Sequence, residues 1–270
     1  MASQQRKQIA LAQNFLKSAD LVRRLLAESS IGSSDTVVDI GAGRGILTAE
    51  LARLARKVVA LETDSELVDL LRKRFQCVAN VNVVEGNFLT YPLPGGDYKI
   101  FANIPYNRTA EIVRKILDAS PAPSDAYLIL QKEAAEKFSG RPVETRFSIL
   151  VKPRFQFRIA RKFRRTDFEP VPGVDSVLLH IQKRSLPLVP PTDADLFQKM
   201  VCYGFAGWNR SLGKTFQPIF SYRQWKILSQ ELRFPLSATP SEISLEQWLG
   251  LLDCLKRRVP SYKQMRLRIG

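Results

Sequence analysis

Residues 37–45 read Val-Val-Asp-Ile-Gly-Ala-Gly-Arg-Gly and place a glycine-rich turn directly after an apolar run. Glycine lets the backbone turn sharply and approach a ligand closely. Residues 46–55 follow with apolar side chains at helical spacing, so the stretch predicts a strand, a tight turn and a helix. A turn of this kind between a strand and a helix is typical of sheets that bind a ligand at the ends of their strands.

The same alternation extends along the first half of the chain. Strands are expected at 36–40, 57–62, 81–85, 98–103 and 126–131, and helices at 19–28, 46–55, 66–75 and 109–117. Strands that alternate with helices predict an α/β fold, a mainly parallel Rossmann-like sheet with helices on both faces. Two further strands are expected at 148–160 and 174–183.

Composition limits the partners. The chain has 270 residues, a net charge of +15 and a pI near 10, which favours a polyanionic partner and above all nucleic acid. A membrane surface is the competing partner, but neither terminus shows a strongly amphipathic basic helix, and no apolar run approaches the roughly 18 residues of a membrane span. Cys77, Cys202 and Cys254 are widely spaced, odd in number and without metal-ligand spacing, so we expect reduced thiols in a cytoplasmic protein and no metal. The expected oligomeric state is a monomer.

A proline-rich segment at 185–191 is the clearest linker. Beyond it, residues 193–203, 222–232 and 244–258 read as helices without strands between them, and Ser241 or Ser244 is expected to cap the last one. The sequence therefore predicts two domains, a catalytic domain at 1–184 and a small all-helical domain at 192–270, to which we assign RNA binding.

Acidic residues at the ends of two expected strands indicate a cofactor site. Asp39 precedes the turn, where it can organise the loop amides, and Glu62 ends the next strand, where a ribose diol would lie. The third glycine of the turn does not have the spacing of the dinucleotide fingerprint, and no phosphate-binding lysine follows the turn. These features favour S-adenosylmethionine, which carries ribose and adenine but no phosphate, over a dinucleotide.

Residues 86–89, Gly-Asn-Phe-Leu, end the third expected strand. We expect Asn87 to accept from the adenine amine and Phe88 to lie against the ring. A polar turn without a ligand is the alternative interpretation.

Asn103-Ile104-Pro105-Tyr106 follows the next strand and is typical of methylation at an exocyclic amine of a nucleobase. A side-chain amide oxygen and the Ile104 carbonyl, both accepting from the amine, would favour the pyramidal geometry that frees its lone pair. Proline restricts Ile104 to extended conformations, and Tyr106 offers a flat face for stacking. The alternative is a strand that ends at an Asn-rich turn, with Tyr106 as a packing residue.

Residues 168–176 form a rigid loop that begins with Phe168. A second ring opposite Tyr106 would hold a flipped-out base between two aromatic faces. The alternative is that Phe168 fills the core.

Cations precede this loop and interleave with Phe155, Phe157 and Phe163. An RNA backbone track is the interpretation we favour over a solvated face, and the basic tail at 256–268 is equally compatible with a frayed end and with RNA contact. The residues assigned to RNA binding are Arg108, Lys152, Arg154, Arg161, Lys162, Arg164 and Arg165.

In these motifs the chain resembles the rRNA adenine-N(6) methyltransferases, most closely the erythromycin-resistance type that modifies 23S rRNA. The resemblance is carried by residues 13–16, 39–45, Glu62, 103–107 and 168–176, and by the last helix around 246–248. It implies a cofactor site at Asn14, Leu16, Gly41, Glu62, Asn87 and Asn103, to which the adjoining Gly43, Thr63 and Phe88 are added. It also implies that Asn103, Ile104, Pro105 and Tyr106 hold the target adenine and that Phe168 stacks on it.

Two residues depart from the family pattern. Asn87 stands where the family usually has aspartate, which puts cofactor affinity in doubt, and Asp39 stands where the erythromycin-resistance type more often has glutamate.

The expected activity is S-adenosylmethionine-dependent methylation of the N(6) amine of one adenine in 23S rRNA. The resemblance implies reduced binding of macrolide, lincosamide and streptogramin B antibiotics. One alternative is a small-subunit (16S) rRNA dimethyltransferase acting on two adjacent adenines, which Ile104 and the short C-terminal domain disfavour. Another is a nucleic-acid-binding relative that kept the fold without the activity.

Overall fold

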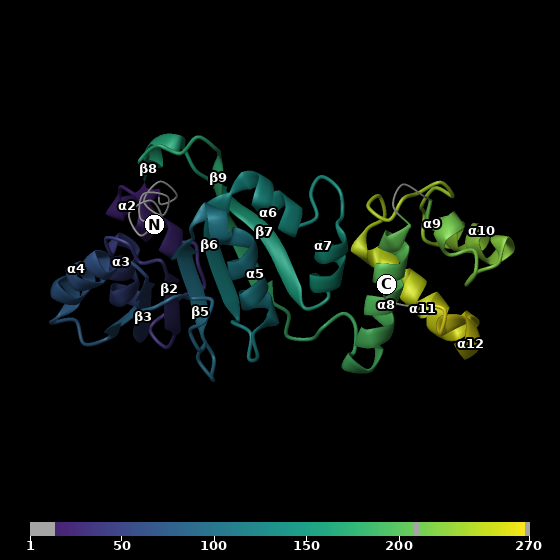
Figure 1. Cartoon of the computed structure of the whole chain (residues 1–270), viewed down its shortest axis with the longest axis horizontal. Helices are drawn as coiled ribbons and strands as arrows, with labels where there is room; N and C mark the ends of the chain where they lie inside the picture. The colour runs from purple at the N-terminus through teal and green to yellow at the C-terminus, as the bar shows by residue number, and fades with distance from the viewer. Residues whose placement is uncertain (1–13, 208–210, 268–270) are drawn as a thin grey trace, which may run out of the picture. The chain divides into compact units, whose positions relative to one another are not determined.

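The structure is a computed structural model and describes residues 14–207 and 211–267 (Figure 1). They form two compact units. The first consists of the described residues of Met1–Ala135 together with Phe157–Lys183, and the second of Glu136–Gln156 together with the described residues of Arg184–Gly270. The chain changes unit again at Arg184, and residues 136–156, which the sequence assigned to the domain 1–184, group with the C-terminal helices.

A seven-stranded sheet forms the centre of the first unit (Figure 1). Its order is β4-β3-β2-β5-β6-β9-β7; β2 to β6 pair in parallel and β9 pairs antiparallel to β6. Val37 and Val38 are fully buried, as expected for a parallel strand covered on both faces. The strands are β2 (Thr36–Ile40), β3 (Lys57–Glu62), β4 (Val81–Glu85), β5 (Lys99–Asn103), β6 (Asp125–Gln131), β7 (Phe155–Lys162) and β9 (Ser176–Lys183).

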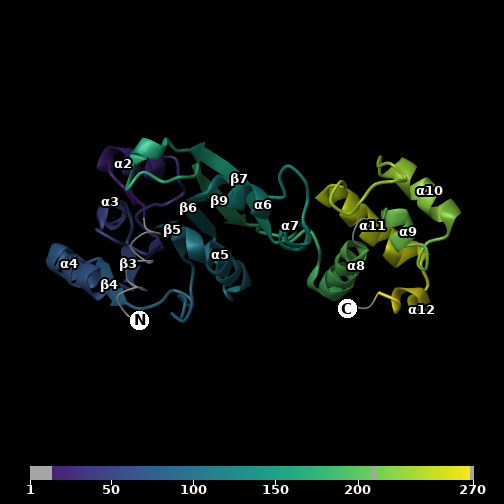
Figure 2. The ribbon, with the colours of Figure 1, turned by 45° about the horizontal axis from the view of Figure 1, so that its top comes forward.

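Helices cover both faces of this sheet, as the sequence predicts (Figure 2). On one face, α2 (Ala19–Ala27) and α3 (Ile46–Leu54) bury their apolar sides in one core with side chains of β2, β3, β5 and β6. α4 (Ser65–Phe75) packs beside β3 and β4, and Asp64 caps its first turn. α5 (Thr109–Asp118) buries its apolar side on the opposite face.

A second, two-stranded sheet joins two distant segments. β1 (Phe15–Leu16) pairs antiparallel with β8 (Phe168–Glu169), and the Lys17 amide donates to the Asp167 carbonyl at 3.0 Å. The N-terminal segment is thereby held beside the loop that precedes β9. The sequence pattern did not predict this pairing, because two-residue strands carry no periodicity.

The prediction of a strand at 148–160 is wrong for the first part of this range. Residues Arg146–Val151 form helix α7, and β7 begins only at Phe155. Thr145 starts the helix with a capping box: its hydroxyl accepts from the Ser148 amide at 3.0 Å, and the Ser148 hydroxyl accepts from the Thr145 amide at 2.8 Å. Ile149 is buried in the core of the C-terminal helices, which explains why this segment belongs to the second unit.

The second unit is otherwise built of helices around an aromatic core that contains Phe216, Trp225 and Trp248. Ser244 caps α11, and it is one of the two serines, Ser241 and Ser244, that the sequence offers for this cap. The all-helical C-terminal part predicted from the sequence is therefore confirmed. Its helices are α8 (Ala194–Ala206), α9 (Leu212–Thr215), α10 (Tyr222–Glu231), α11 (Leu245–Arg258) and α12 (Ser261–Gln264).

The remaining elements are short. They are α6 (Lys132–Phe138) and the 3-10 turns η1 (Tyr106–Arg108), η2 (Arg165–Asp167) and η3 (Pro191–Asp193). Across the part of the chain that the structure describes, no helix has the length and apolarity needed to span a membrane.

Candidate cofactor and base site

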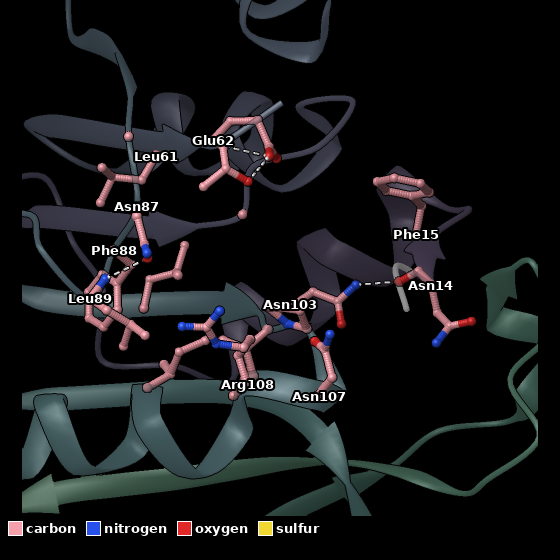
Figure 3. A pocket seen from close by; sticks show the side chains of 17 residues that line it. Asn14, Phe15, Leu61, Glu62, Asn87, Phe88, Leu89, Asn103, Asn107 and Arg108 are labelled. Carbon is pink, nitrogen blue, oxygen red and sulfur yellow. Dashed lines mark hydrogen bonds between the residues drawn. The ribbon is translucent and has the colours of Figure 1, made fainter. Parts of the chain in front are cut away.

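The carboxyl ends of β2, β3, β4 and β5 meet at one edge of the sheet and line a cavity of about 300 Å³ (Figure 3). A smaller cavity of about 30 Å³ is lined by Leu16, Asp39, Gly41 and Asn103, among others. The predicted residues that line the larger cavity are Asn14, Gly41, Glu62, Thr63, Asn87, Phe88, Asn103, Ile104, Pro105 and Arg108. Residues from four strand ends are thus brought together.

The glycine-rich turn adopts backbone angles that need glycine. Gly41, Gly43 and Gly45 have φ values of 70°, 57° and 76°, in the left-handed region. A Cβ atom on Gly43 would also lie 2.6 Å from a ring carbon of Phe15. The Phe15 ring therefore packs directly on the turn at Gly43. Phe15 lines the cavity, whereas Gly43 does not.

Glu62 holds this turn in place. Its Oε2 accepts from the Gly43 amide at 2.8 Å, and its Oε1 accepts from the Thr63 and Asp64 amides at 2.7 and 3.1 Å. The side chain is almost fully buried, yet a carboxylate oxygen has room for more than one donor. Glu62 can therefore accept from a ligand hydroxyl while it organises the loop.

Asp39 was expected to organise the loop amides, but the described contacts give that role to Glu62. Asp39 Oδ2 instead accepts from the Thr48 hydroxyl at 2.7 Å. Desolvation by burial raises the pKa of Asp39 from its ordinary value of 3.8 to about 7; the Thr48 hydrogen bond opposes the rise and the nearby Glu62 charge adds to it.

The loop after β4 is both a polar turn and part of the cavity wall. Asn87 Oδ1 accepts from the Leu89 amide at 2.9 Å, and the Asn87 carbonyl accepts from the Thr90 and Tyr91 amides at 3.0 Å. Phe88 is mostly buried and lines the cavity. Because one lone pair of Oδ1 is used inside the turn, Asn87 has less capacity for a ligand than the sequence suggests.

Asn103 lies where the cavity meets the N-terminal segment. Its Nδ2 donates to the Asn14 carbonyl at 2.5 Å (Figure 3). The amide oxygen is then the atom left to accept from a substrate. Ile104 is buried, its amide donates to the Ile129 carbonyl at 3.2 Å, and Pro105 is extended at φ −65° and ψ 129°. The tetrapeptide is thus fixed at both ends.

Tyr106 is half-buried just beyond the cavity lining. Its hydroxyl forms a hydrogen bond of 2.6 Å with the hydroxyl of Ser176, the buried first residue of β9. Burial raises the pKa of Tyr106 above its ordinary value of 10.0, although the Ser176 bond opposes the rise. The ring is therefore held in one orientation and the phenol stays neutral at physiological pH.

Phe168 does not reach the cavity in this structure. It is fully buried, and its ring packs edge-on against Phe163 with centroids 5.4 Å apart. The β1–β8 pairing holds it in the core together with Leu16. The expectation of a ring free to stack on a base is not met here, and the alternative of a core residue describes the position of Phe168.

The cations assigned to RNA binding divide into two groups. Three are neutralised by acids within their own unit: Lys152 by Glu144, Arg161 by Glu28 at 3.1 Å, and Arg165 by Asp175 at 3.0 Å. The Lys152–Glu144 pair is largely buried. These three positions are therefore poorer RNA ligands than their charge suggests.

Lys162, Arg164 and Arg154 are more available, whereas Arg108 is paired with an acid like the first three. Lys162 and Arg164 are exposed, and neither has an ion pair within residues 14–207 and 211–267. Arg154 lies over the Phe155 ring at 5.2 Å. Arg108 lines the cavity while its guanidinium pairs with Glu111 at 2.8 Å.

The lining residues that were not assigned from the sequence are Phe15, Ile40, Leu61, Gly86, Leu89, Asn107 and Ile112. Phe15 and Asn107 adjoin assigned residues, so adjacency was the available signal. Ile112 lies on the buried side of α5, where nothing in the sequence separates a cavity wall from an ordinary core position.

The lining fits S-adenosylmethionine. Glu62 offers an acceptor for a ribose diol, whereas Phe88, Leu89 and Ile112 form an apolar wall for a purine. Gly86 has nothing within 4 Å of an added Cβ position, so the backbone there is open to a ligand. Arg108 is the one cation among the lining residues that the structure describes, and it is already paired with Glu111, as expected for a ligand without phosphate.

Comparisons with known proteins show the family to which the chain belongs. The model of the family "Ribosomal RNA adenine dimethylase" matches residues 4–256. An rRNA adenine N-6-methyltransferase of Streptomyces fradiae is 33% identical over 251 residues, which cover 91% of this chain and 78% of that protein. A ribosomal RNA small subunit methyltransferase A of Geobacter sulfurreducens is 35% identical over 213 residues, which cover 75% of this chain and 77% of that protein.

Among solved structures, that of the 23S rRNA methyltransferase ErmE matches with a TM-score of 0.85 and 28% identity, over 90% of this chain and 100% of the ErmE chain. Fold and site together define the class, a Rossmann-like S-adenosylmethionine-dependent methyltransferase. The chain belongs to the ribosomal RNA adenine dimethylase family, and its activity is methylation of adenine in rRNA.

Proposed function

We propose that this enzyme methylates the exocyclic N(6) amine of one adenine in 23S rRNA and thereby lowers the binding of macrolide, lincosamide and streptogramin B antibiotics. The observation that carries the chemistry is the Asn103 amide, whose nitrogen is held by the Asn14 carbonyl at the cavity edge. The similarity to ErmE, which extends over that whole chain, supports the 23S target.

The cavity at the strand ends takes the cofactor in this proposal. S-adenosylmethionine supplies, when bound, a methyl group on a sulfonium. Glu62 accepts from its ribose, and residues 86–89 with Ile112 enclose its adenine. Asn14, Gly41 and Asn103 line the same cavity.

Asn103 and Ile104 prepare the target amine. An exocyclic amine is a poor nucleophile because its lone pair is delocalised into the ring. The Asn103 amide oxygen and the Ile104 carbonyl both accept from the amine and favour the pyramidal form. Tyr106, held by Ser176, supplies the face on which the flipped base stacks.

The proposal needs no strong general base. The amine becomes acidic only after its nitrogen has gained the methyl group, so water can take the proton. Orientation of the amine in line with the methyl donor supplies most of the acceleration. The neutral Tyr106 phenol agrees with this scheme, because it is a hydrogen-bonding and stacking group rather than a base.

A second candidate is dimethylation of two adjacent adenines in small-subunit rRNA. It is favoured by the Geobacter sulfurreducens relative, whose identity of 35% exceeds that of the Streptomyces fradiae protein but over a shorter stretch. The two candidates share the cofactor cavity and differ in the RNA.

Methyl transfer from labelled S-adenosylmethionine to purified rRNA tests the proposal. Protein-free 23S and 16S rRNA, taken from a host that lacks both modifications, serve as separate substrates. We expect label in 23S rRNA with the wild type and none with Asn103→Ala. Label that enters only 16S rRNA would favour the second candidate.

A further inference from the structure

Lys115 lies in the last turn of α5 and turns its amine toward the loop after β4. Its Nζ donates to the Phe88 carbonyl and to the Tyr91 carbonyl, each at 2.6 Å. The same nitrogen lies 5.0 Å from the centroid of the Phe88 ring. An ammonium has three donors, and these two hydrogen bonds use two of them while the charge lies near the Phe88 ring.

The loop that Lys115 holds forms the purine end of the cavity. Asn87, Phe88 and Leu89 line it, and the turn from Asn87 to Tyr91 is closed by backbone bonds to the Asn87 carbonyl. Among the side-chain donors of the described residues, Lys115 alone donates to the Phe88 and Tyr91 carbonyls. Lys115 itself does not line the cavity.

α5 also contributes directly to the same end of the site. Ile112, three residues before Lys115, lines the cavity. α5 therefore supplies both Ile112, which lines the cavity, and Lys115, which binds the loop after β4. Both walls of the end of the cavity assigned to the purine depend on this one helix. Desolvation lowers the pKa of the Lys115 amine, in keeping with an amine directed at protein carbonyls rather than at solvent.

We propose that Lys115 is a positioning residue for cofactor binding: its ammonium clamps the Phe88 and Tyr91 carbonyls and so sets Asn87 and Phe88 against the adenine ring of S-adenosylmethionine. The inference rests on the proposed function in one respect, the placement of the cofactor adenine against residues 86–89. It adds a determinant that does not touch the cofactor.

The test is S-adenosylmethionine affinity by calorimetry, with turnover on 23S rRNA as a second readout. Lys115→Met removes the donors and keeps much of the side-chain length. We expect an approximately tenfold weaker Kd, because part of two charge-assisted hydrogen bonds is lost, with kcat at saturating cofactor and KM for RNA within about twofold of the wild type. Lys73→Met, which removes an exposed lysine from α4, is the matched control and should leave all three values unchanged.

Two further measurements separate positioning from a general loss of structure. Lys115→Arg keeps a cation with several donors, and its Kd should stay within about threefold of the wild type. In Lys115→Met, amide exchange should accelerate at residues 89–91 while β2 and β5 keep their protection.

The outcomes are distinct. If wild-type protein fails to bind S-adenosylmethionine, the proposed function and this inference both fall. If the wild type binds and Lys115→Met has the same Kd, the inference alone is overturned. It is also overturned if Lys115→Arg loses as much affinity as Lys115→Met, or if kcat falls while the cofactor Kd is unchanged.

Discussion

The side chain of Asn103 donates to the backbone carbonyl of Asn14 across 89 positions of sequence, at a distance of 2.5 Å. This bond connects the end of β5 to the segment just before β1, and β1 in turn pairs with β8. Because the bond uses the amide nitrogen of Asn103, the amide oxygen is the atom that can accept from a substrate. The orientation of the Asn103 amide therefore depends on the segment that begins at Asn14.

Asn103→Ala and Asn103→Asp should both lower kcat by about 100-fold, the scale seen when a preorganised hydrogen-bonding group is removed from an active site. Aspartate keeps acceptor oxygens but has no donor for the Asn14 carbonyl, so it is expected to be misoriented. Single-turnover methyl transfer measures the effect. Asn82→Ala, on the exposed side of β4, is the control, and wild-type rates in Asn103→Asp would show that the Asn14 bond does not matter.

The two parts of Tyr106 should contribute differently. Tyr106→Phe removes the hydrogen bond to Ser176 and should cost less than about tenfold in kcat/KM. Tyr106→Ala also removes the ring, and the loss of a stacking face should cost about 100-fold or more. Equal activity of the two variants would mean that the ring does not hold the base.

Most of the sheet was predictable because its signal is local. The runs around Val38, Val59 and Ile100 are short, apolar and separated by helical periodicity, and the strands end at the expected residues. The segment 146–151 was not predictable in this way. Its alternating side chains suggest a strand, but the Thr145–Ser148 capping box and the burial of Ile149 among the C-terminal helices produce a helix.

The site was predictable where a motif sits at a strand end, as for Glu62 and Asn103. It was not predictable where a role depends on long-range packing. Phe168 has the flanking prolines of a presented ring, yet the β1–β8 pairing buries it. Lys115 has an ordinary helical context, and only the fold shows that its amine reaches the loop after β4.

Asp39 should give the protein a pH-dependent stability. Its pKa is raised from 3.8 to about 7 in the folded state, mainly by desolvation. Between those values the folded protein holds a proton that the unfolded chain has released, so stability falls as pH rises through this window. The slope of the unfolding free energy against pH is at most about 1.4 kcal/mol per pH unit, and this slope vanishes above the folded pKa.

Asp39→Asn should remove this slope and be more stable than the wild type at pH 8, since asparagine can still accept from Thr48. Urea unfolding at pH 5 and pH 8 measures the difference. The same pH dependence in both proteins would contradict a protonated Asp39.

Substitution of an exposed, unpaired cation should weaken RNA binding, whereas substitution of a cation that is already ion-paired should not. Lys162→Ala and Arg164→Ala should each weaken binding and reduce the salt slope of log K by about one, the effect of losing one phosphate contact. Lys152→Ala should leave the slope unchanged and instead destabilise the fold, because it leaves the largely buried Glu144 without its partner. Fluorescence anisotropy with an rRNA fragment at several salt concentrations measures the slopes, and a reduced slope in Lys152→Ala would return that residue to the RNA surface.

Mapping of N(6)-methylated adenines in total rRNA, from methylation-deficient cells that express this chain, tests the central claim most directly. We predict new methylation at one adenine of 23S rRNA, absent with Asn103→Ala and accompanied by decreased susceptibility to macrolides. Methylation confined to two adjacent adenines of 16S rRNA would contradict the assignment.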